Sequence, residues 1–457
     1  MNASHRLFCL GLLLTVLLIG ASFIGHSDAA GQHPDPVIAA TSPPDVAIPD
    51  GFSDNPIAFF DDFSWRTFLA LSWPAQTGAR GQPDTQRILG DATGPRVWET
   101  WKADYEIFQP NGAPPSEWQS TSAISPCPEV AFATAGAEKV LRSFSKGGNV
   151  LEAFNQASFG VPSGALVAQN GTYVRYEMRT NRAEFDFIRG APEDPTSALY
   201  LRSNLPTGGS PELRFPDGSI SVKAAWRELS ASESSLFDRY YHVTARLFDP
   251  VTRQCTTKTM GLVGFHIVER TPSRPQWVWA TFEHVDNVVV GPNAPAGTKP
   301  SFNNPVGPQT GPSVDRLERP INATHPPSPK PQPSQVVRLK TINPSTEETN
   351  TLYQKKLAGT VWTNYKLVMT QWPTQPANPG AGNPFPSDAP TSTSTSNVTL
   401  ETQAAFQRGV SCMTCHVSDK PANTEFVWFL SIHAFPQAPS DAARSLRTAF
   451  AATKVKK

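Results

Sequence analysis

The spacing of apolar residues predicts one strong helix near the start of the chain, from Pro56 to Trp73. Asp54 or Asn55 can cap this helix, because proline is well suited to the first turn that follows a cap. Pro74 ends the pattern. The apolar residues form a broad stripe that must pack against a core, and they are Phe59, Phe60, Phe63, Phe68, Leu69 and Leu71.

Between residues 95 and 290, short β-type runs alternate with Pro/Gly turns and predict a series of strands. Asn170–Gly171 is a hairpin-turn signal. Ile220 to Trp226 alternates apolar and polar residues, as a half-buried strand does. The sequence therefore predicts an α+β protein with a β-rich antiparallel main domain, for which a sandwich is one possible arrangement, and a small α-helical C-terminal segment.

Two segments, Gly261–Arg270 and Gln276–Val285, predict an antiparallel hairpin whose turn spans residues 271–275. Each arm carries one histidine, His266 on the first and His284 on the second. If Glu269 opposes Trp277, both histidines lie on the same face of the sheet, because opposed residues share a side. A slip of one residue separates them.

The later part of the chain changes composition twice. Proline is dense from residue 291 to about residue 345, which predicts a semi-rigid linker or a strap over the surface. Residues 347–372 have a long helical pattern, and residues 399–410 predict a short helix. The predicted regions are a leader at 1–29, an extended lead at 30–55, the β-rich domain at 56–290, the Pro-rich stretch at 291–345 and a helical region at 346–457.

The first 29 residues have the pattern of a secretory signal peptide. Arg6 precedes an apolar run from Leu7 to Gly25, and Ser27-Asp28-Ala29 places small residues where a signal peptidase cleaves. We expect a cleaved signal and a periplasmic protein. The alternative is an uncleaved N-terminal anchor, which is the only case in which we expect membrane contact.

Charge and composition narrow the class of function. The 457 residues include 39 Lys+Arg and 39 Asp+Glu, so the formal net charge is zero. Proteins that hold nucleic acid need a basic surplus to neutralise phosphates, and we therefore expect no nucleic-acid partner. The 11 tryptophans and 26 phenylalanines supply enough apolar surface for a folded core.

Five cysteines divide by position. Cys9 lies in the predicted signal, which leaves four in the mature chain: Cys127, Cys255, Cys412 and Cys415. An exported protein can form disulfides, and Cys127 with Cys255 is the candidate pair once Cys412 and Cys415 are assigned to another role. The alternative for Cys127 and Cys255 is two unpaired thiols.

The segment Cys412-Met413-Thr414-Cys415-His416 contains the Cys-x-x-Cys-His pattern of covalent c-type haem attachment. Two thiols three positions apart on a helical turn can reach the two vinyl groups of one haem, and the next histidine can reach the iron. A thioredoxin-like redox pair is disfavoured because no βαβ pattern surrounds the segment. A zinc site needs a second ligand pair, which Cys127 and Cys255 are not spaced to form.

This segment, from Asn397 to His416, resembles the haem-attachment region of the c-type cytochromes, where a helix commonly leads into the pattern. The resemblance implies one haem c bound to Cys412 and Cys415, with His416 as the proximal ligand. The upstream chain looks similar to large exported proteins of the cytochrome c family, notably in residues 223–229 and 277–287. The chain departs from the compact cytochromes because no methionine follows His416. We therefore expect upstream residues to cover part of the haem.

Several residues are candidates for the sixth ligand. His433 lies 17 residues after His416 in an apolar segment, and the alternative is a histidine at a helix end that faces carbonyl groups or solvent. His266 and His284 are the next candidates, each with a structural alternative as a core histidine. Three methionines are weaker candidates, namely Met178, Met260 and Met369, and an open iron is the remaining possibility.

Lys223 and Glu283 are charged residues in otherwise apolar, aromatic-rich strands. Buried charges are usually paired, so the simpler interpretation is a structural Lys223–Glu283 ion pair. The alternative places both residues beside the haem in acid–base work, which makes them weak catalytic candidates.

These observations favour an exported cytochrome that passes single electrons to or from a periplasmic redox partner. Such encounters use small and local docking patches, so zero net charge does not argue against them. The alternative is a haem-dependent oxidase, peroxidase or oxygenase with its substrate between the β-rich domain and the haem, because electron transfer alone does not need such a large domain. A sensor domain with an attached haem is a third possibility. The oligomeric state is left open.

Overall fold

The computed structural model describes residues 33–49, 55–120, 127, 139–142, 165–206, 213–249, 252, 254–309, 326–373, 395–402, 412, 416, 425–426 and 428–436. Eight strands lie in these ranges: β1 (Lys102–Ala103), β2 (Lys139–Leu141), β3 (Arg175–Thr180), β4 (Ile220–Glu228), β5 (His242–Phe248), β6 (Cys255–Thr271), β7 (Arg274–His284) and β8 (Tyr365–Gln371). The predicted leader at 1–29 and Cys415 lie outside the described residues.

Helices surround the strands. The α-helices are α1 (Pro56–Leu71), α2 (Asp104–Ile107), α3 (Arg182–Arg189), α4 (Pro344–Lys356) and α7 (Trp428–His433). Short 3-10 helices connect them: η1 (Val97–Thr100), η2 (Pro110–Gly112), η3 (Pro195–Ser197), η4 (Arg202–Asn204), η5 (Ala231–Arg239) and η6 (Val361–Asn364). No helix within the described ranges has the length and apolarity that a bilayer span requires.

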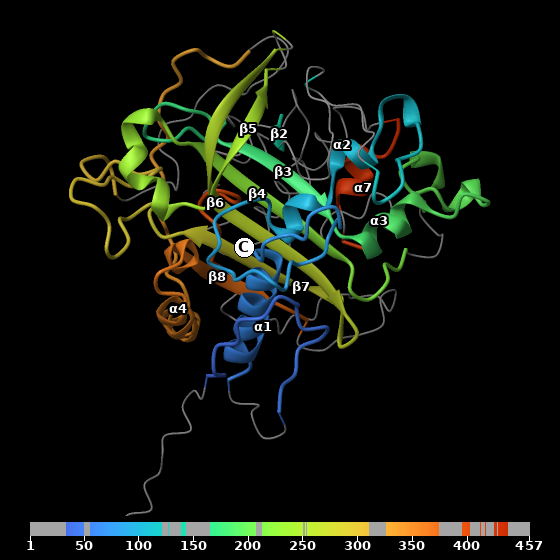
Figure 1. Cartoon of the computed structure of the whole chain (residues 1–457), viewed down its shortest axis with the longest axis horizontal. Helices are drawn as coiled ribbons and strands as arrows, with labels where there is room; N and C mark the ends of the chain where they lie inside the picture. Colours follow the sequence, from blue (N-terminus) through green and yellow to red (C-terminus); the bar gives the residue numbers. More distant parts are fainter. Residues whose placement is uncertain are drawn as a thin grey trace, which may run out of the picture.

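The described strands form one curled mixed sheet, in which the long strand β6 pairs with three neighbours (Figure 1). The sheet order is β1-β3-β4-β6-β5-β2, and β7 and β8 extend it from another part of β6. The pairs are antiparallel except for β2 with β5, which is parallel. The chain is therefore α+β with a strand-rich sheet, as predicted, but the described strands lie in one sheet instead of the two of a sandwich.

Helix α1 covers one face of this sheet. It begins at Pro56 as predicted, and its apolar stripe places Trp65 and Phe68 against the sheet. The Phe68 ring stacks on Phe282 of β7 with ring centroids 4.3 Å apart, and it meets Phe265 of β6 edge-on at 5.8 Å. These rings are fully buried, and burial of each stabilises the fold by about 2 kcal/mol.

The opposite face carries a second apolar cluster. Its buried members come from β3, β4 and β6 and from loops that are distant in sequence: Leu166, Val174, Tyr176, Ala225, Val263, Phe302, Val336, Val398 and Leu400. Two backbone bonds fasten the described part of the Pro-rich stretch here, from Ser334 N to Val167 O (3.0 Å) and from Val336 N to Phe302 O (2.8 Å). Strand β4 is consequently covered on both faces, although its alternating sequence predicted a half-buried strand.

The β6–β7 hairpin forms as predicted, and its register separates the two histidines. Glu269 opposes Val278 instead of Trp277, and His266 opposes Thr281. The pairing shifts close to the turn, where Trp277 has φ of 71°. The bulge adds two residues on β7, so it leaves the faces unchanged, and it is the pairing of Glu269 with Val278, one residue from the predicted Trp277, that separates the histidines. His266 and His284 therefore lie on opposite faces of the sheet.

The predicted helix over residues 347–372 is wrong in its second half. Helix α4 ends at Lys356, and Gly359 follows with φ of 84°, a conformation that glycine adopts without strain. Residues 365–371 then form β8, which pairs with β7 in the main sheet. The periodic apolar residues suit a helix, but pairing with an available strand satisfies the backbone and buries these residues on both sides.

Candidate functional site

The sheet face opposite α1 carries the polar residues of the candidate site. We call this surface the polar face, and it comprises Lys223 and Ala225 of β4, Gly264 and His266 of β6, and Trp279, Thr281 and Glu283 of β7. The register places these residues on one side, because Lys223 opposes His266 and His266 opposes Thr281. Ala225, Gly264 and Glu283 form the next row.

The chain segment at residues 395–402 lies across the polar face, and Asn397 fastens it there. The Asn397 side-chain amide donates to Thr281 Oγ1 (2.9 Å) and to the Phe282 carbonyl (2.8 Å). Its Oδ1 accepts from the backbone N–H groups of Thr399 (2.9 Å) and Leu400 (3.1 Å). One buried side chain therefore both anchors the segment to β7 and shapes its turn.

Gly264 makes the close approach of this segment possible. A Cβ atom at position 264 would lie 2.1 Å from Thr399 Oγ1 and 3.2 Å from Asn397 Oδ1. Any side chain there would push the segment away from the sheet. The approach matters because this segment is the last described part of the chain before Cys412.

Glu283 also fastens residues 395–402 to the sheet. Its carboxylate accepts the Val398 N–H (2.5 Å) and forms an ion pair with Arg338. Arg338 also donates to the Ser396 carbonyl (3.0 Å). Glu283 therefore pairs with Arg338 of the Pro-rich stretch in place of the predicted Lys223. Glu283 serves here to fasten the chain.

The charge of Lys223 acts on a different carboxyl group, that of Glu184 on α3. Glu184 is fully buried and accepts hydrogen bonds from Ser221 Oγ at 2.8 Å. Burial raises the pKa of Glu184 to about 8, although the Ser221 hydrogen bond and the Lys223 charge act in the opposite direction. Glu184 is therefore mostly protonated at neutral pH and can donate a proton near the polar face.

His266, Glu401 and Cys412 meet at one point of the polar face. His266 Nε2 lies 3.3 Å from Glu401 Oε1, and the Cys412 thiol donates to the same oxygen at 3.9 Å. His266 is largely buried, with 8% of its surface exposed. The structure therefore brings a histidine of the sheet next to the first cysteine of the Cys-x-x-Cys-His pattern.

His416 is oriented by two contacts. Its Nδ1 lies 2.7 Å from the Phe426 carbonyl, and because a carbonyl oxygen only accepts, Nδ1 must carry the proton. The neutral ring then has its lone pair on Nε2. The ring also lies 4.5 Å from the Trp279 ring of the polar face, measured between centroids.

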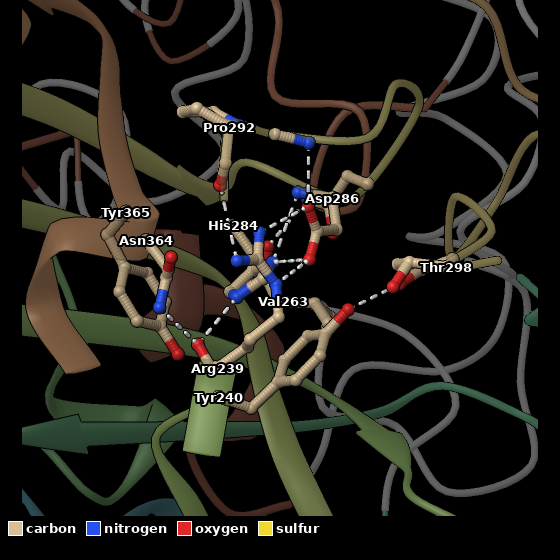
Figure 2. A network of polar contacts seen from close by, with 12 residues as sticks. Arg239, Tyr240, Val263, His284, Asp286, Pro292, Thr298, Asn364 and Tyr365 are labelled. Carbon is tan, nitrogen blue, oxygen red and sulfur yellow. Dashed lines mark hydrogen bonds and ion pairs between the residues drawn. The ribbon is translucent and has the colours of Figure 1, made fainter. Parts of the chain in front are cut away.

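His433 and His284 occupy other surroundings. His433 ends α7, and its buried ring stacks on Phe108, next to α2, with centroids 5.5 Å apart. His284 belongs to the network of Figure 2, where Nε2 donates to the Arg239 carbonyl (2.9 Å) and Nδ1 accepts from Asp286 N–H (3.1 Å). Both ring nitrogens of His284 are thus engaged in holding the loop after β7.

The other candidates are also placed. Met178, on β3, opposes Lys223 of β4. Met369, on β8, opposes Thr281 of β7. Met260 lies six residues before His266 on β6, which is about 20 Å along a strand. Cys127 and Cys255 are joined by a disulfide with Cα atoms 5.9 Å apart, and this is the pair named from the sequence. Neither pattern nor spacing pointed to Glu184, Arg338 or Glu401.

Acid should destabilise the protein through His284. Burial lowers the pKa of this histidine to about 4, and the nearby Asp286 charge only partly opposes the shift. In the unfolded chain the pKa of His284 is about 6.5. Between pH 6.5 and 4, His284 is therefore protonated in the unfolded state and neutral in the folded state. The stabilisation from neutral, buried His284 is fully present above pH 6.5. We expect the free energy of unfolding to fall by about 3 kcal/mol as the pH drops to 4.

Urea unfolding of wild type and His284→Gln between pH 7 and 4 checks this expectation. The variant should show a shallower dependence on pH, because glutamine does not titrate. His242→Gln is the matched control, since His242 is exposed at the start of β5. Equal slopes for wild type and His284→Gln would contradict the assignment.

Within the described residues, no group of three or more His, Cys, Asp or Glu side chains is arranged to hold a metal ion. The chain matches no protein-family model, no curated protein and no solved structure.

Proposed function

We propose that this protein is an exported c-type cytochrome that binds one haem covalently and transfers single electrons. Cys412 and Cys415 would form the two thioether links, and His416 would bind the iron. The leader-like residues 1–29 support this proposal, because c-type haem is attached outside the cytoplasm. The cofactor supplies one-electron chemistry at its iron when bound.

The observation that carries the proposal is the hydrogen bond from His416 Nδ1 to the Phe426 carbonyl. Histidines that bind a metal commonly donate their other ring N–H to a carbonyl, which fixes both the tautomer and the ring orientation. The bond directs the Nε2 lone pair of His416 away from the backbone at Phe426. His416 therefore fits the role of an axial ligand by its chemistry as well as by its position in the motif.

The polar face supplies the surroundings that the haem segment cannot. The Trp279 ring lies 4.5 Å from the His416 ring, measured between centroids, and gives the imidazole an apolar neighbour. Asn397 and Glu283 hold the approach to Cys412 against β7. We infer that the haem segment uses the sheet as one wall.

The partner is a periplasmic redox protein. Zero net charge gives no long-range attraction, so docking relies on a local patch and a weak encounter. We expect no nucleic-acid partner, and contact with a membrane only if the leader stays uncleaved.

One observation favours a second function, a haem-dependent oxidoreductase acting on an organic substrate. Glu184 is buried and mostly protonated at neutral pH, close to Lys223 of the polar face. A carboxyl group with a raised pKa is a suitable proton donor for acid–base chemistry. An electron carrier has no need of such a group, although burial beside Ser221 also explains it structurally.

The two functions differ in the iron's sixth position, and carbon monoxide tests it. For a carrier we expect a low-spin spectrum in the reduced protein, with no change when carbon monoxide is added, because both axial positions are filled. Absorption spectra of the dithionite-reduced full chain, before and after carbon monoxide, give the answer. A high-spin spectrum that shifts with carbon monoxide would contradict the carrier and favour the oxidoreductase.

A further inference from the structure

We propose that His266 would supply a second protein nitrogen to the haem iron, in addition to that of His416. This inference rests on the proposed function, because it needs the haem at Cys412 and Cys415. Two observations carry it: His266 and Cys412 meet at one carboxylate oxygen of Glu401, and His416 contacts Trp279 on the strand paired with that of His266.

The sheet register brings His266 close to Trp279, whose ring contacts His416. His266 directly opposes Thr281, so Trp279 is its diagonal neighbour across β6 and β7. Diagonal neighbours on one face of an antiparallel pair are about 7 Å apart, within reach of large side chains. Because the Trp279 ring touches His416, the two histidines border the same stretch of the polar face.

Glu401 shows which way the His266 ring points. Its Oε1 atom is the shared partner of His266 Nε2 (3.3 Å) and the Cys412 thiol (3.9 Å). The distance between His266 Nε2 and Cys412 Sγ therefore cannot exceed the sum of these two contact distances. His266 thus presents Nε2, the usual iron-binding nitrogen, toward the cysteine that would hold the porphyrin.

The alternative histidines are less suited. His284 lies on the opposite face of the sheet, and both of its ring nitrogens already hold backbone groups. The ring of His433 is stacked on Phe108, the residue that follows α2. Position in the sequence favoured His433, whereas the strand pairing favours His266.

A second imidazole would complete the function of a carrier. Strong nitrogen ligands on both sides keep the iron in the same spin state in both oxidation states, so few atoms move when an electron is gained or lost. The central position of His266 in a strand paired on both sides holds its ring in place during this change.

The test compares wild type, His266→Gln and the control His242→Gln, each as the full chain with attached haem. Glutamine keeps a polar group near Glu401 but is a poor iron ligand, so the fold should tolerate it better than alanine. Near-infrared magnetic circular dichroism of the oxidised proteins identifies the axial ligands, and haem staining after a denaturing gel reports the covalent link separately.

We expect a bis-imidazole signature in wild type and in His242→Gln. His266→Gln should lose this signature completely, become high-spin, bind carbon monoxide when reduced, and return to low spin when imidazole is added. A wild-type spectrum of another ligand pair overturns the inference even if the variant fails to fold, and so does an unchanged spectrum in a haem-stained His266→Gln. Wild type without a haem stain overturns the proposed function instead.

Discussion

Replacing Cys412 and Cys415 together by alanine removes all covalently bound haem, which is the largest effect that we expect. The two thioether links need the sulfurs of Cys412 and Cys415. Cys127 and Cys255 cannot replace them, because these two cysteines are joined in a disulfide. His416 alone could retain haem only by a reversible iron bond, which denaturation breaks. Haem-dependent staining after a denaturing gel should show wild type as a stained band and the double variant as an unstained one.

A matched control changes a residue between the two cysteines and keeps their spacing. Met413→Ala lies between the two cysteines and leaves Cys-x-x-Cys-His intact, so the stain should be as strong as in wild type. All three proteins need expression with their leader in a cell that has a working attachment system. An unstained wild type under these conditions would contradict the proposed function, whatever the variants show.

Loss of the Cys127–Cys255 disulfide should lower the free energy of unfolding by about 4 kcal/mol. The bond joins residues 128 positions apart, and a cross-link that closes so long a loop restricts the unfolded chain strongly. The double variant Cys127→Ser with Cys255→Ser, compared with wild type in denaturant unfolding, measures this loss. Cys127 is fully buried beside Tyr105 and Phe248, so the introduced hydroxyl group adds to the effect.

A reductant separates the bond from the packing. Wild type treated with dithiothreitol should move most of the way to the midpoint of the variant, whereas the variant itself should not respond. Haem staining should persist in both, because the second cysteine pair is separate. A wild-type midpoint that does not respond to reductant would show that the bond contributes nothing.

Local signals predicted the elements whose partners are near in sequence. Helix α1 begins at Pro56 because the apolar stripe and the proline agree. The β6–β7 hairpin forms where two apolar runs flank a short turn. Gly171, in the predicted Asn170–Gly171 turn, has φ of 77°, and Val167 pairs with Tyr173 across it. In each case, the residues that decide the structure lie within a few positions of one another.

The sequence-based predictions were wrong where pairing with a distant strand determines the local structure. Residues 365–371 carry apolar residues at spacings that fit a helix, but β7 offers an unpaired edge, and pairing with it produces β8. The register of the hairpin depends on the backbone at Trp277, where φ of 71° begins a shift that no propensity scale indicates. The pairing of Glu269 with Val278, instead of Trp277, puts His266 on the polar face and His284 on the other.

By itself, the sequence determined the candidate chemistry, because the spacing of Cys412, Cys415 and His416 is a local relation within one turn of chain. It also named the disulfide pair by elimination. Only the tertiary structure decided that Glu283 binds Arg338, that Glu401 lies between His266 and Cys412, and that Trp279 faces His416. Apart from the contact of Glu401 with Cys412, those contacts join residues more than 50 positions apart. Such contacts depend on strand register, which is set by packing across the whole sheet.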